Sequence, residues 1–185
     1  MAPSQRRFEL RDRTREGHDR LDAAVGAFGT LDAYCHYIAR IGSFRATMDA
    51  ALLNAVWPDE WRWRPTWVAD ALADDTLDLK LPPASQQKVC LDLADESALL
   101  GTLYVLEGST LGARVLRQRA LALGLDETFG ARHLALMSND IAQWQSFLVL
   151  LDSAPDFNIE RAAASANAVF AFALRCFESD CLVVQ

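Results

Sequence analysis

The sequence predicts a compact, all-α, multi-helix protein, and three observations lead to that prediction. Alanine and leucine recur at helical spacing, whereas the alternation of β-branched residues that is typical of strands is nearly absent. The 9 glycines and 6 prolines are widely spaced. A length of 185 residues suits one core better than two, so we expect a single domain over residues 1–185, with about seven or eight helices.

Two long helices are expected first. An amphipathic period defines one from about Ser4 to Ala24. Thr30 is a good N-cap, because its side-chain oxygen can accept a backbone N–H from the next turn. The second helix is therefore expected to follow Thr30 and to run to about Val56.

The middle of the chain is expected to be less regular. Residues Trp57–Leu81 contain four tryptophans and two prolines, with a short helix predicted around Trp67–Ala73. Pro82–Pro83 closes this segment, and Ser85 is expected to open another short helix. We expect the tryptophans to pack the irregular segment onto the core, and the alternative is an exposed interaction surface.

The helical period returns in the second half of the chain. A helix over Ser97–Leu123 is expected to end at Gly124, because glycine readily adopts the positive φ of a helix C-terminus. Another helix is expected over Phe129–Leu151. A last one follows Pro155, over about Ile159–Ser179.

Charge, hydropathy and cysteine spacing exclude several classes of protein. The net charge of −7 and pI near 4.9 disfavour nucleic acid as a partner, so an anionic ligand needs a local basic patch. No apolar run approaches membrane-spanning length, and the first ten residues lack the apolar core of a signal peptide, so we expect none. The cysteines form no CxxC pair, so we expect a cytoplasmic protein without a membrane partner. The basic patch is expected at the N-terminus, at Arg6, Arg7, Arg11, Arg13, Arg15 and Arg20. The four cysteines are Cys35, Cys90, Cys176 and Cys181.

The first helix places a histidine on the boundary of its apolar stripe. On a helical wheel His18 lies between that stripe and a polar side that carries Arg11 and Arg15. An imidazole beside two guanidinium groups suits a flat apolar ligand with a metal at its centre and carboxylates at its rim. Alternatively, His18 is an ordinary boundary residue and the arginines pair with acids one turn away. His36 and His133 are weaker candidates, the latter expected to be solvent-exposed.

Three glycines share one face of the helix expected over Ser97–Leu123. They are Gly101, Gly108 and Gly112. Each costs roughly 0.5–1 kcal/mol relative to alanine, so something must compensate. Either another helix packs closely against this face, or a ligand lies flat on it.

Two segments resemble the biliverdin-producing heme oxygenases. LRDRTREGHDRLD (residues 10–22) is similar to the family's first-helix motif, whose histidine is the proximal heme ligand. LYVLEGSTLGARVL (residues 103–116) resembles the distal-helix motif of the bacterial branch, and the two segments have the order and spacing of the family. The phenylalanine spacing of the last helix and a Trp-x-x-Phe pair, Trp144 and Phe147, fit as well.

The resemblance implies a heme oxygenase-like fold with heme between the first and distal helices. His18 would ligate the heme iron, and Arg11 and Arg15 would face the propionates. Gly108, Ser109 and Gly112 would form the catalytic distal wall. The remaining expected heme contacts are Thr14, Tyr104, Phe170 and Phe177.

Two departures from the family pattern affect the chemistry that the resemblance implies. Ser109 stands where many members have an aspartate that anchors the water network for proton delivery, so that relay is unassigned. No arginine occurs between Ile141 and Leu151, where animal enzymes place a propionate anchor. The ring position that would be opened is therefore undetermined.

The resemblance implies oxidative cleavage of heme by O2 to biliverdin, carbon monoxide and ferrous iron. The chain has no nucleotide-binding fingerprint, so electrons are expected from an external ferredoxin or reductase. A downstream acceptor for biliverdin is a further expected partner. The main alternative is a heme-binding or heme-transfer protein of the same fold without turnover. A thiamin-degrading hydrolase on a similar scaffold is another, although no cysteine has a suitable setting.

Overall fold

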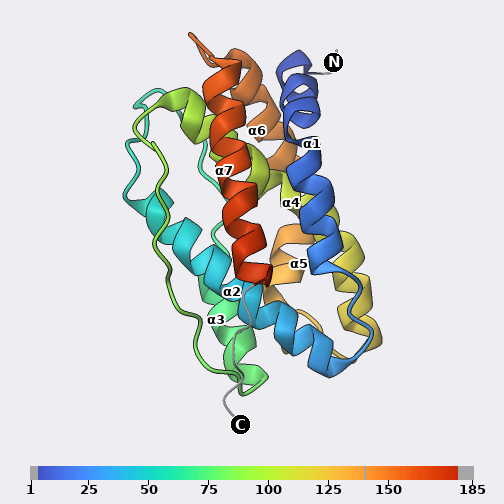
Figure 1. The fold of residues 1–185 in the computed structure, drawn as a ribbon. Coiled ribbons are helices and arrows are strands. Elements are labelled where there is room, and N and C mark those ends of the chain that lie inside the picture. The colour runs from blue at the N-terminus through green and yellow to red at the C-terminus, as the bar shows by residue number, and fades with distance from the viewer. Residues whose placement is uncertain (1–3, 140, 179–185) are drawn as a thin grey trace.

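The computed structural model describes residues 4–139 and 141–178, and the described residues form seven α-helices (Figure 1). The prediction of an all-α protein is confirmed. The helices are α1 (Gln5–Val25), α2 (Leu31–Leu53), α3 (Ala69–Asp78), α4 (Glu96–Ala122), α5 (Arg132–Asn139), α6 (Ile141–Ser153) and α7 (Ile159–Glu178).

Several helix ends follow from local sequence, as expected. The Ser4 hydroxyl accepts the Arg7 N–H at 3.0 Å and caps α1, and the Thr30 hydroxyl accepts the Ala33 N–H at 3.2 Å and caps α2. Gly124 follows the end of α4 with a φ of +81°, a conformation that glycine adopts without strain. These caps fix the starts of α1 and α2 and the end of α4 within a few residues of prediction.

Two helix starts differ from the expectation because distant residues decide them. Within the span predicted as one helix over Phe129–Leu151, the described residues form α5 and α6, and the side chain of Asp75 accepts the first N–H groups of α5. The short helix begins at Ala69 because Asp49 of α2 accepts the N–H groups of Val68 and Ala69.

The helix expected at Ser85 does not form, and the segment from residue 81 to residue 92 has no regular structure. α2 also ends at Leu53, before the predicted Val56. The Asn54 side chain donates to the Ala50 carbonyl at 2.8 Å and satisfies one of the last backbone acceptors of α2.

α7 packs along both α4 and α1 and holds the fold together (Figure 1). It lies close to α4 at Gly101, where an added Cβ would overlap the carbonyl oxygen of Ala162. It lies close to α1 at Gly17, where an added Cβ would lie 3.0 Å from the Cβ of Phe170. α1 makes far fewer contacts with α4 than with α7, so these two helices are joined mainly through α7.

The tryptophan-rich segment packs largely onto the core. Trp61 is buried, and Trp57 and Trp63 pack against the same apolar cluster. Trp67 is 39% exposed, so the expectation is confirmed for three of the four tryptophans. In the described part of the chain, no helix has the length and apolar character needed to cross a membrane.

Candidate functional site

α1 and α4 approach each other at two places. At one, the Tyr104 phenol of α4 lies beside Thr14, Arg7 and Arg11 of α1. Burial raises the pKa of Tyr104, whereas the two arginine charges and the hydrogen bond with Thr14 lower it. At the other, the Arg119 guanidinium donates to the Gly26 carbonyl at 3.1 Å. About 18 Å of α1 and about 22 Å of α4 lie between these contacts, at about 1.5 Å per residue.

We call the surface between the two contacts the α1–α4 face: His18 and its neighbours on α1, with residues 108–115 on α4. His18 is one turn beyond Thr14, and Gly108 is one turn beyond Tyr104. Residues four apart share a helix face, so both continue from the side on which the helices meet. From this periodicity we expect His18 and the distal glycines to border the same surface.

On α1, the His18 side chain is 59% exposed but is held on two sides. Its ring packs edge-on to Phe170, with the ring centroids 6.0 Å apart, and the missing side chain of Gly17 lets Phe170 come close. Its Nδ1 lies 3.4 Å from the Asp22 carboxylate. A carboxylate at Nδ1 favours a proton there and leaves Nε2 as the ligating nitrogen.

On α4, the three glycines have three different surroundings. Gly101 is used for helix packing, as described above. A Cβ on Gly108 would be in ordinary contact with Trp144, at 3.8 Å, and a Cβ on Gly112 would meet nothing within 4 Å. Close helix packing, one of the two alternatives from the sequence, is therefore seen at Gly101, whereas Gly112 faces open space.

The open part of the α1–α4 face is apolar. Leu111 and Val115, on either side of Gly112, are 47% and 55% exposed. Ser109 is also exposed, and its hydroxyl donates to the Leu106 carbonyl at 2.5 Å. Exposed apolar side chains around a bare helix backbone are the surroundings that a flat apolar ligand would cover.

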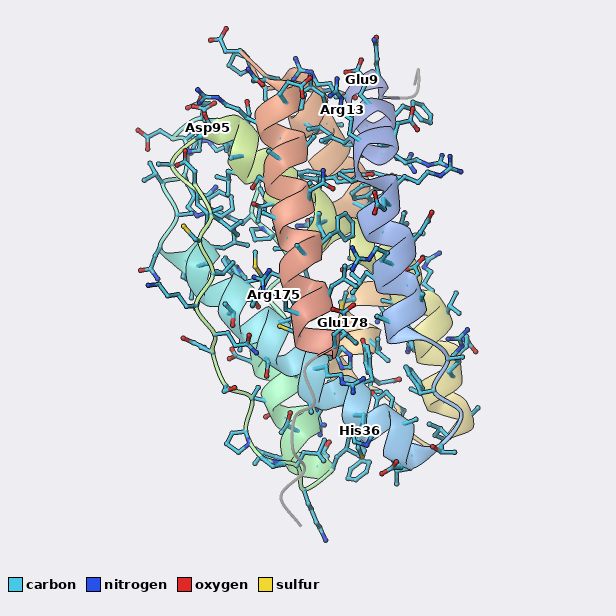
Figure 2. The ribbon with its side chains drawn as sticks, in the orientation of Figure 1. Glu9, Arg13, His36, Asp95, Arg175 and Glu178 are labelled. Atoms are coloured by element: carbon cyan, nitrogen blue, oxygen red, sulfur yellow. The ribbon has the colours of Figure 1, made fainter. Side chains whose placement is uncertain are left out.

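The arginines of α1 fall into two groups. Arg13 pairs with Glu160 of α7 at 2.8 Å, on the side of α1 that faces α7 (Figure 2). Arg11 and Arg15 are exposed, and no ion pair is found for either among the residues that the structure describes. The pairing with acids one turn away, the alternative from the sequence, is thus not seen, and both guanidinium groups can meet an anionic ligand.

Phe170 and Phe177 lie at different depths behind this face. Phe170 is buried directly beneath His18 and Gly17. Phe177, two turns further along α7, is buried against Tyr37 of α2, with ring centroids 6.3 Å apart. Phe170 therefore contacts His18 of the α1–α4 face directly.

The expectation that His133 is solvent-exposed is wrong. Its side chain is fully buried, with Nδ1 2.7 Å from the Asp75 carboxylate and Nε2 3.2 Å from the Tyr37 hydroxyl. Sequence reasoning missed this cluster because its members come from three helices and have no common spacing. The only local signal is the position of His133 at the start of a helix, which equally fits a surface residue.

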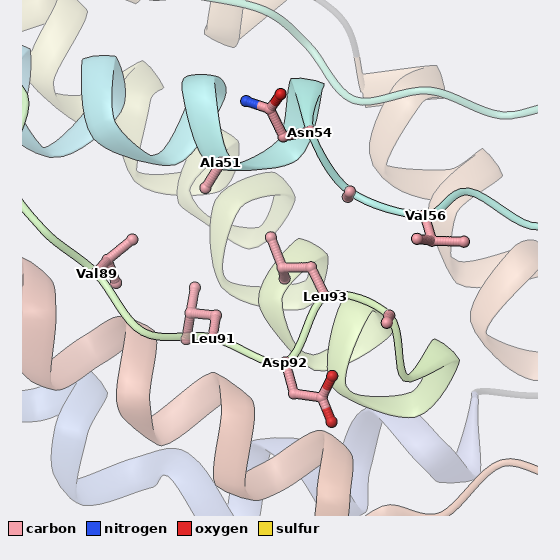
Figure 3. Close-up of a pocket in the computed structure, with 9 residues that line it drawn as sticks. Ala51, Asn54, Val56, Val89, Leu91, Asp92 and Leu93 are labelled. Carbon is pink, nitrogen blue, oxygen red and sulfur yellow. The ribbon is translucent and has the colours of Figure 1, made fainter.

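A shallow groove elsewhere, of about 340 Å³, has no part in this arrangement (Figure 3). The end of α2 and the segment from Val89 to Ala94 line it, and it contains none of the predicted site residues. Among the described residues, no three His, Cys, Asp or Glu side chains gather to hold a metal ion.

Comparison with known proteins supports the same assignment. No family model matches the chain. Heme oxygenase PigA of Pseudomonas aeruginosa is 35% identical over 166 residues, with 82% of each chain covered. The crystal structure of the NO- and CO-bound heme oxygenase of Neisseria meningitidis superposes with a TM-score of 0.70 at 27% identity, covering 93% of this chain and 92% of the other. This chain therefore belongs to the bacterial branch of the heme oxygenase family.

Proposed function

We propose that the α1–α4 face binds heme with His18 as the iron ligand, and that the chain cleaves this heme to biliverdin, carbon monoxide and ferrous iron. The observation that carries the proposal is the pairing of an exposed, oriented imidazole with a glycine that faces open space on the neighbouring helix. The family membership supports the reaction. The roles of individual residues in this reaction are our assignments.

The residues present fit a heme. Leu111, Val115 and the bare backbone at Gly112 offer an apolar wall, and covering such surface is favourable at about 25 cal/mol per Å². Phe170 gives an apolar backing to His18 on the other side. Arg11 and Arg15 supply positive charge for the heme carboxylates, in a chain that is otherwise acidic.

The proximal residues orient the imidazole. The Asp22 carboxylate holds a proton on Nδ1 of His18, so Nε2 is directed to the ligand. Phe170 restricts rotation of the ring. Heme, when bound, supplies both the redox-active iron and the ring that is oxidised.

The distal residues shape the opposite side. Gly108 and Gly112 carry no side chain, so the α4 backbone can approach the bound ligand closely. The Ser109 hydroxyl donates its proton to the Leu106 carbonyl, which leaves the oxygen lone pairs able to accept a hydrogen bond from water. We assign to Ser109 the positioning of a water that delivers protons, in place of the aspartate of many relatives.

The reaction needs partners outside the chain. Electrons come from a ferredoxin or a reductase, because the sequence has no nucleotide-binding fingerprint. A downstream acceptor takes the biliverdin. Cys35 and Cys90 are free thiols, which suits the reducing cytoplasm that we propose as the location.

The test compares His18→Ala with His36→Ala. His36 is a matched control because it is also an exposed helical histidine with an acid one turn away, Asp32 at 3.7 Å (Figure 2). We expect His18→Ala to lose the low-spin spectrum of the ferric heme complex and to form no biliverdin, while His36→Ala behaves as wild type. Unchanged turnover in His18→Ala would remove the central assignment.

The second candidate, a heme-binding protein without turnover, is favoured only by the serine at position 109. Reductant supplied in air to the wild-type heme complex separates the two functions. An oxygenase replaces its Soret band with bilin absorption, whereas a silent binder keeps the Soret band. We expect the former.

A further inference from the structure

Tyr37, His133 and Asp75 form a buried hydrogen-bonded chain that heme binding does not use. They come from α2, α5 and α3, and His133 and Asp75 are both 0% exposed. The Tyr37 hydroxyl lies 3.2 Å from Nε2 of His133, and Nδ1 of His133 lies 2.7 Å from Asp75. A phenol, a base and a carboxylate thus stand in series inside the protein.

The direction of these hydrogen bonds follows from the acceptors. The Asp75 carboxylate already accepts the backbone N–H groups of Arg132 at 2.9 Å and His133 at 3.1 Å, so it acts as an acceptor toward Nδ1 as well. Nδ1 therefore carries the imidazole proton, and Nε2 has a lone pair for the Tyr37 O–H. Burial lowers the pKa of His133 and raises the pKa of Tyr37, so both groups are neutral at rest.

Tyr34 is a natural comparison for Tyr37. Its ring is also buried, and the two ring centroids are only 5.8 Å apart. The Tyr34 hydroxyl, however, donates to the Gly130 carbonyl at 2.7 Å. A peptide carbonyl cannot take up a proton as an imidazole can, so the two tyrosines differ mainly in whether their partner is a base.

This difference decides which phenol can lose an electron. Removing one electron from a phenol makes its proton strongly acidic, and a radical cation left in an apolar interior is costly. At Tyr37 the proton can move to Nε2 of His133, and the resulting imidazolium is balanced by Asp75. At Tyr34 no such acceptor is hydrogen-bonded.

The neighbouring charges do not remove this acceptor. Arg45 is the buried cation that acts electrostatically on both Tyr37 and His133, and it is itself paired with Asp49 at 3.1 Å. Arg132, whose side chain is 29% exposed, contacts Asp75 at 3.4 Å and also pairs with Asp78. Asp75 remains the anion nearest to the imidazole.

Tyr37 also lies behind the α1–α4 face. It contacts Phe177, and both belong to one apolar cluster that includes Ala113 of α4 and has Leu21 of α1 packed against it. Ala113 follows Gly112 directly, and Leu21 is one turn beyond His18. The cluster therefore connects Tyr37 to both helices that would enclose the heme.

We propose that Tyr37 is a redox-active tyrosine that gives one electron to a heme over-oxidised by peroxide, while its phenolic proton moves to Nε2 of His133. The electron reduces the oxidised heme by one equivalent, and Tyr37 becomes a neutral radical beside an imidazolium. One electron from the external donor and the return of the same proton restore the phenol. That an oxidised heme is the electron acceptor rests on the proposed function. That Tyr37 is oxidised in preference to Tyr34 rests only on their hydrogen-bond partners.

The experiment uses electron paramagnetic resonance on rapidly frozen samples of the full chain. The ferric heme complex is mixed with hydrogen peroxide, and protein grown with ring-deuterated tyrosine identifies a tyrosyl signal by its narrowed hyperfine structure. We expect Tyr37→Phe, which removes one hydroxyl, to lose this signal and Tyr34→Phe to keep it. His133→Gln, whose amide can accept a hydrogen bond but not a proton, is expected to lose it while Tyr37 is still present.

A second arm uses heme-free protein and flash-generated tris(bipyridine)ruthenium(III) as a one-electron oxidant, with transient absorption of the tyrosyl radical as the readout. The same ranking of Tyr37→Phe and Tyr34→Phe is expected there, so the proposal can be decided even if heme does not bind. Equal signals in these two variants, loss of the signal in Tyr104→Phe, or a signal that deuterated tyrosine leaves unchanged would overturn the proposal. Thermal melts of both phenylalanine variants verify that they are folded.

Discussion

At Gly101, in the first half of α4, an added Cβ would overlap the Ala162 carbonyl oxygen of α7, whereas at Gly112, in the second half, it would meet no atom within 4 Å. The two glycines lie on the same side of the same helix. The first half of α4 is buried under α7. In the second half, Leu111 and Val115 are about half exposed.

The contrast shows that glycines on one face of one helix have different surroundings in the folded protein. Each glycine costs roughly 0.5–1 kcal/mol of helix stability relative to alanine. At Gly101 the close contact with α7 offsets this cost within the folded chain. At Gly112 the folded chain offers no such contact, and the heme that we propose on the α1–α4 face would cover this position.

Gly101→Ala tests the closed half and should have the largest effect on stability. The new Cβ must push a backbone carbonyl, which cannot move aside as a flexible side chain can, so we expect a loss of about 3 kcal/mol. This corresponds to a fall in Tm of about 6–12 °C for a protein of this size. Calorimetry measures it, with Gly29→Ala as a control because, unlike at Gly101, a Cβ at Gly29 would meet nothing within 4 Å. A loss below about 1 kcal/mol would show that α4 and α7 can separate at little cost.

Helix positions and caps were largely predictable because their causes are local. Thr30 caps the helix that follows it, and Gly124 ends the one before it, as the sequence indicated. The start of α5 was not predictable, because its first N–H groups are accepted by Asp75 from a different helix. The start of α3 depends in the same way on Asp49.

The candidate site shows the same division. The motif residues His18, Ser109 and Gly112 lie on two long helices, and a helical wheel predicts the face on which each of them lies. A wheel cannot distinguish Gly101 from Gly112, because the difference depends on where α7 crosses. Nor could it show that His133 is buried, since its partners are distant in sequence.

Gly112→Leu tests the open half and should separate stability from binding. We expect the free protein to gain roughly 0.5–1 kcal/mol from the better helix former. The leucine should occupy the space above the α4 backbone, so heme affinity should fall by about tenfold or more, about 1.4 kcal/mol. Denaturant melts and heme titration measure the two effects. Unchanged heme affinity would mean that Gly112 does not face the ligand.

The buried side chain of His133 makes the stability of the folded protein depend on pH. Because burial lowers the pKa of His133 from its usual value near 6.5, the unfolded chain binds a proton more readily than the folded one. Stability contributed by the neutral ring is full above about pH 6.5 and falls as the pH drops below it, by up to about 1.4 kcal/mol per pH unit. Urea unfolding of wild type and His133→Gln at about pH 7.5 and about pH 5.5 measures it. Equal pH slopes in the two proteins would contradict the prediction.

The smallest expected effect concerns the arginines that border the open half. Arg11→Gln and Arg15→Gln should each weaken heme binding by about 0.5–1 kcal/mol, roughly two- to fivefold, because exposed ion pairs contribute little individually. Arg13→Gln is the matched control: it is on the same helix and is also exposed, but it is already paired with Glu160 of α7. Heme titration at low and high salt is the measurement, and the differences should shrink with salt. If all three variants bind heme equally well, Arg11 and Arg15 are only part of a solvated helix face, and His18, the open backbone at Gly112 and the apolar side chains around it account for recognition without them.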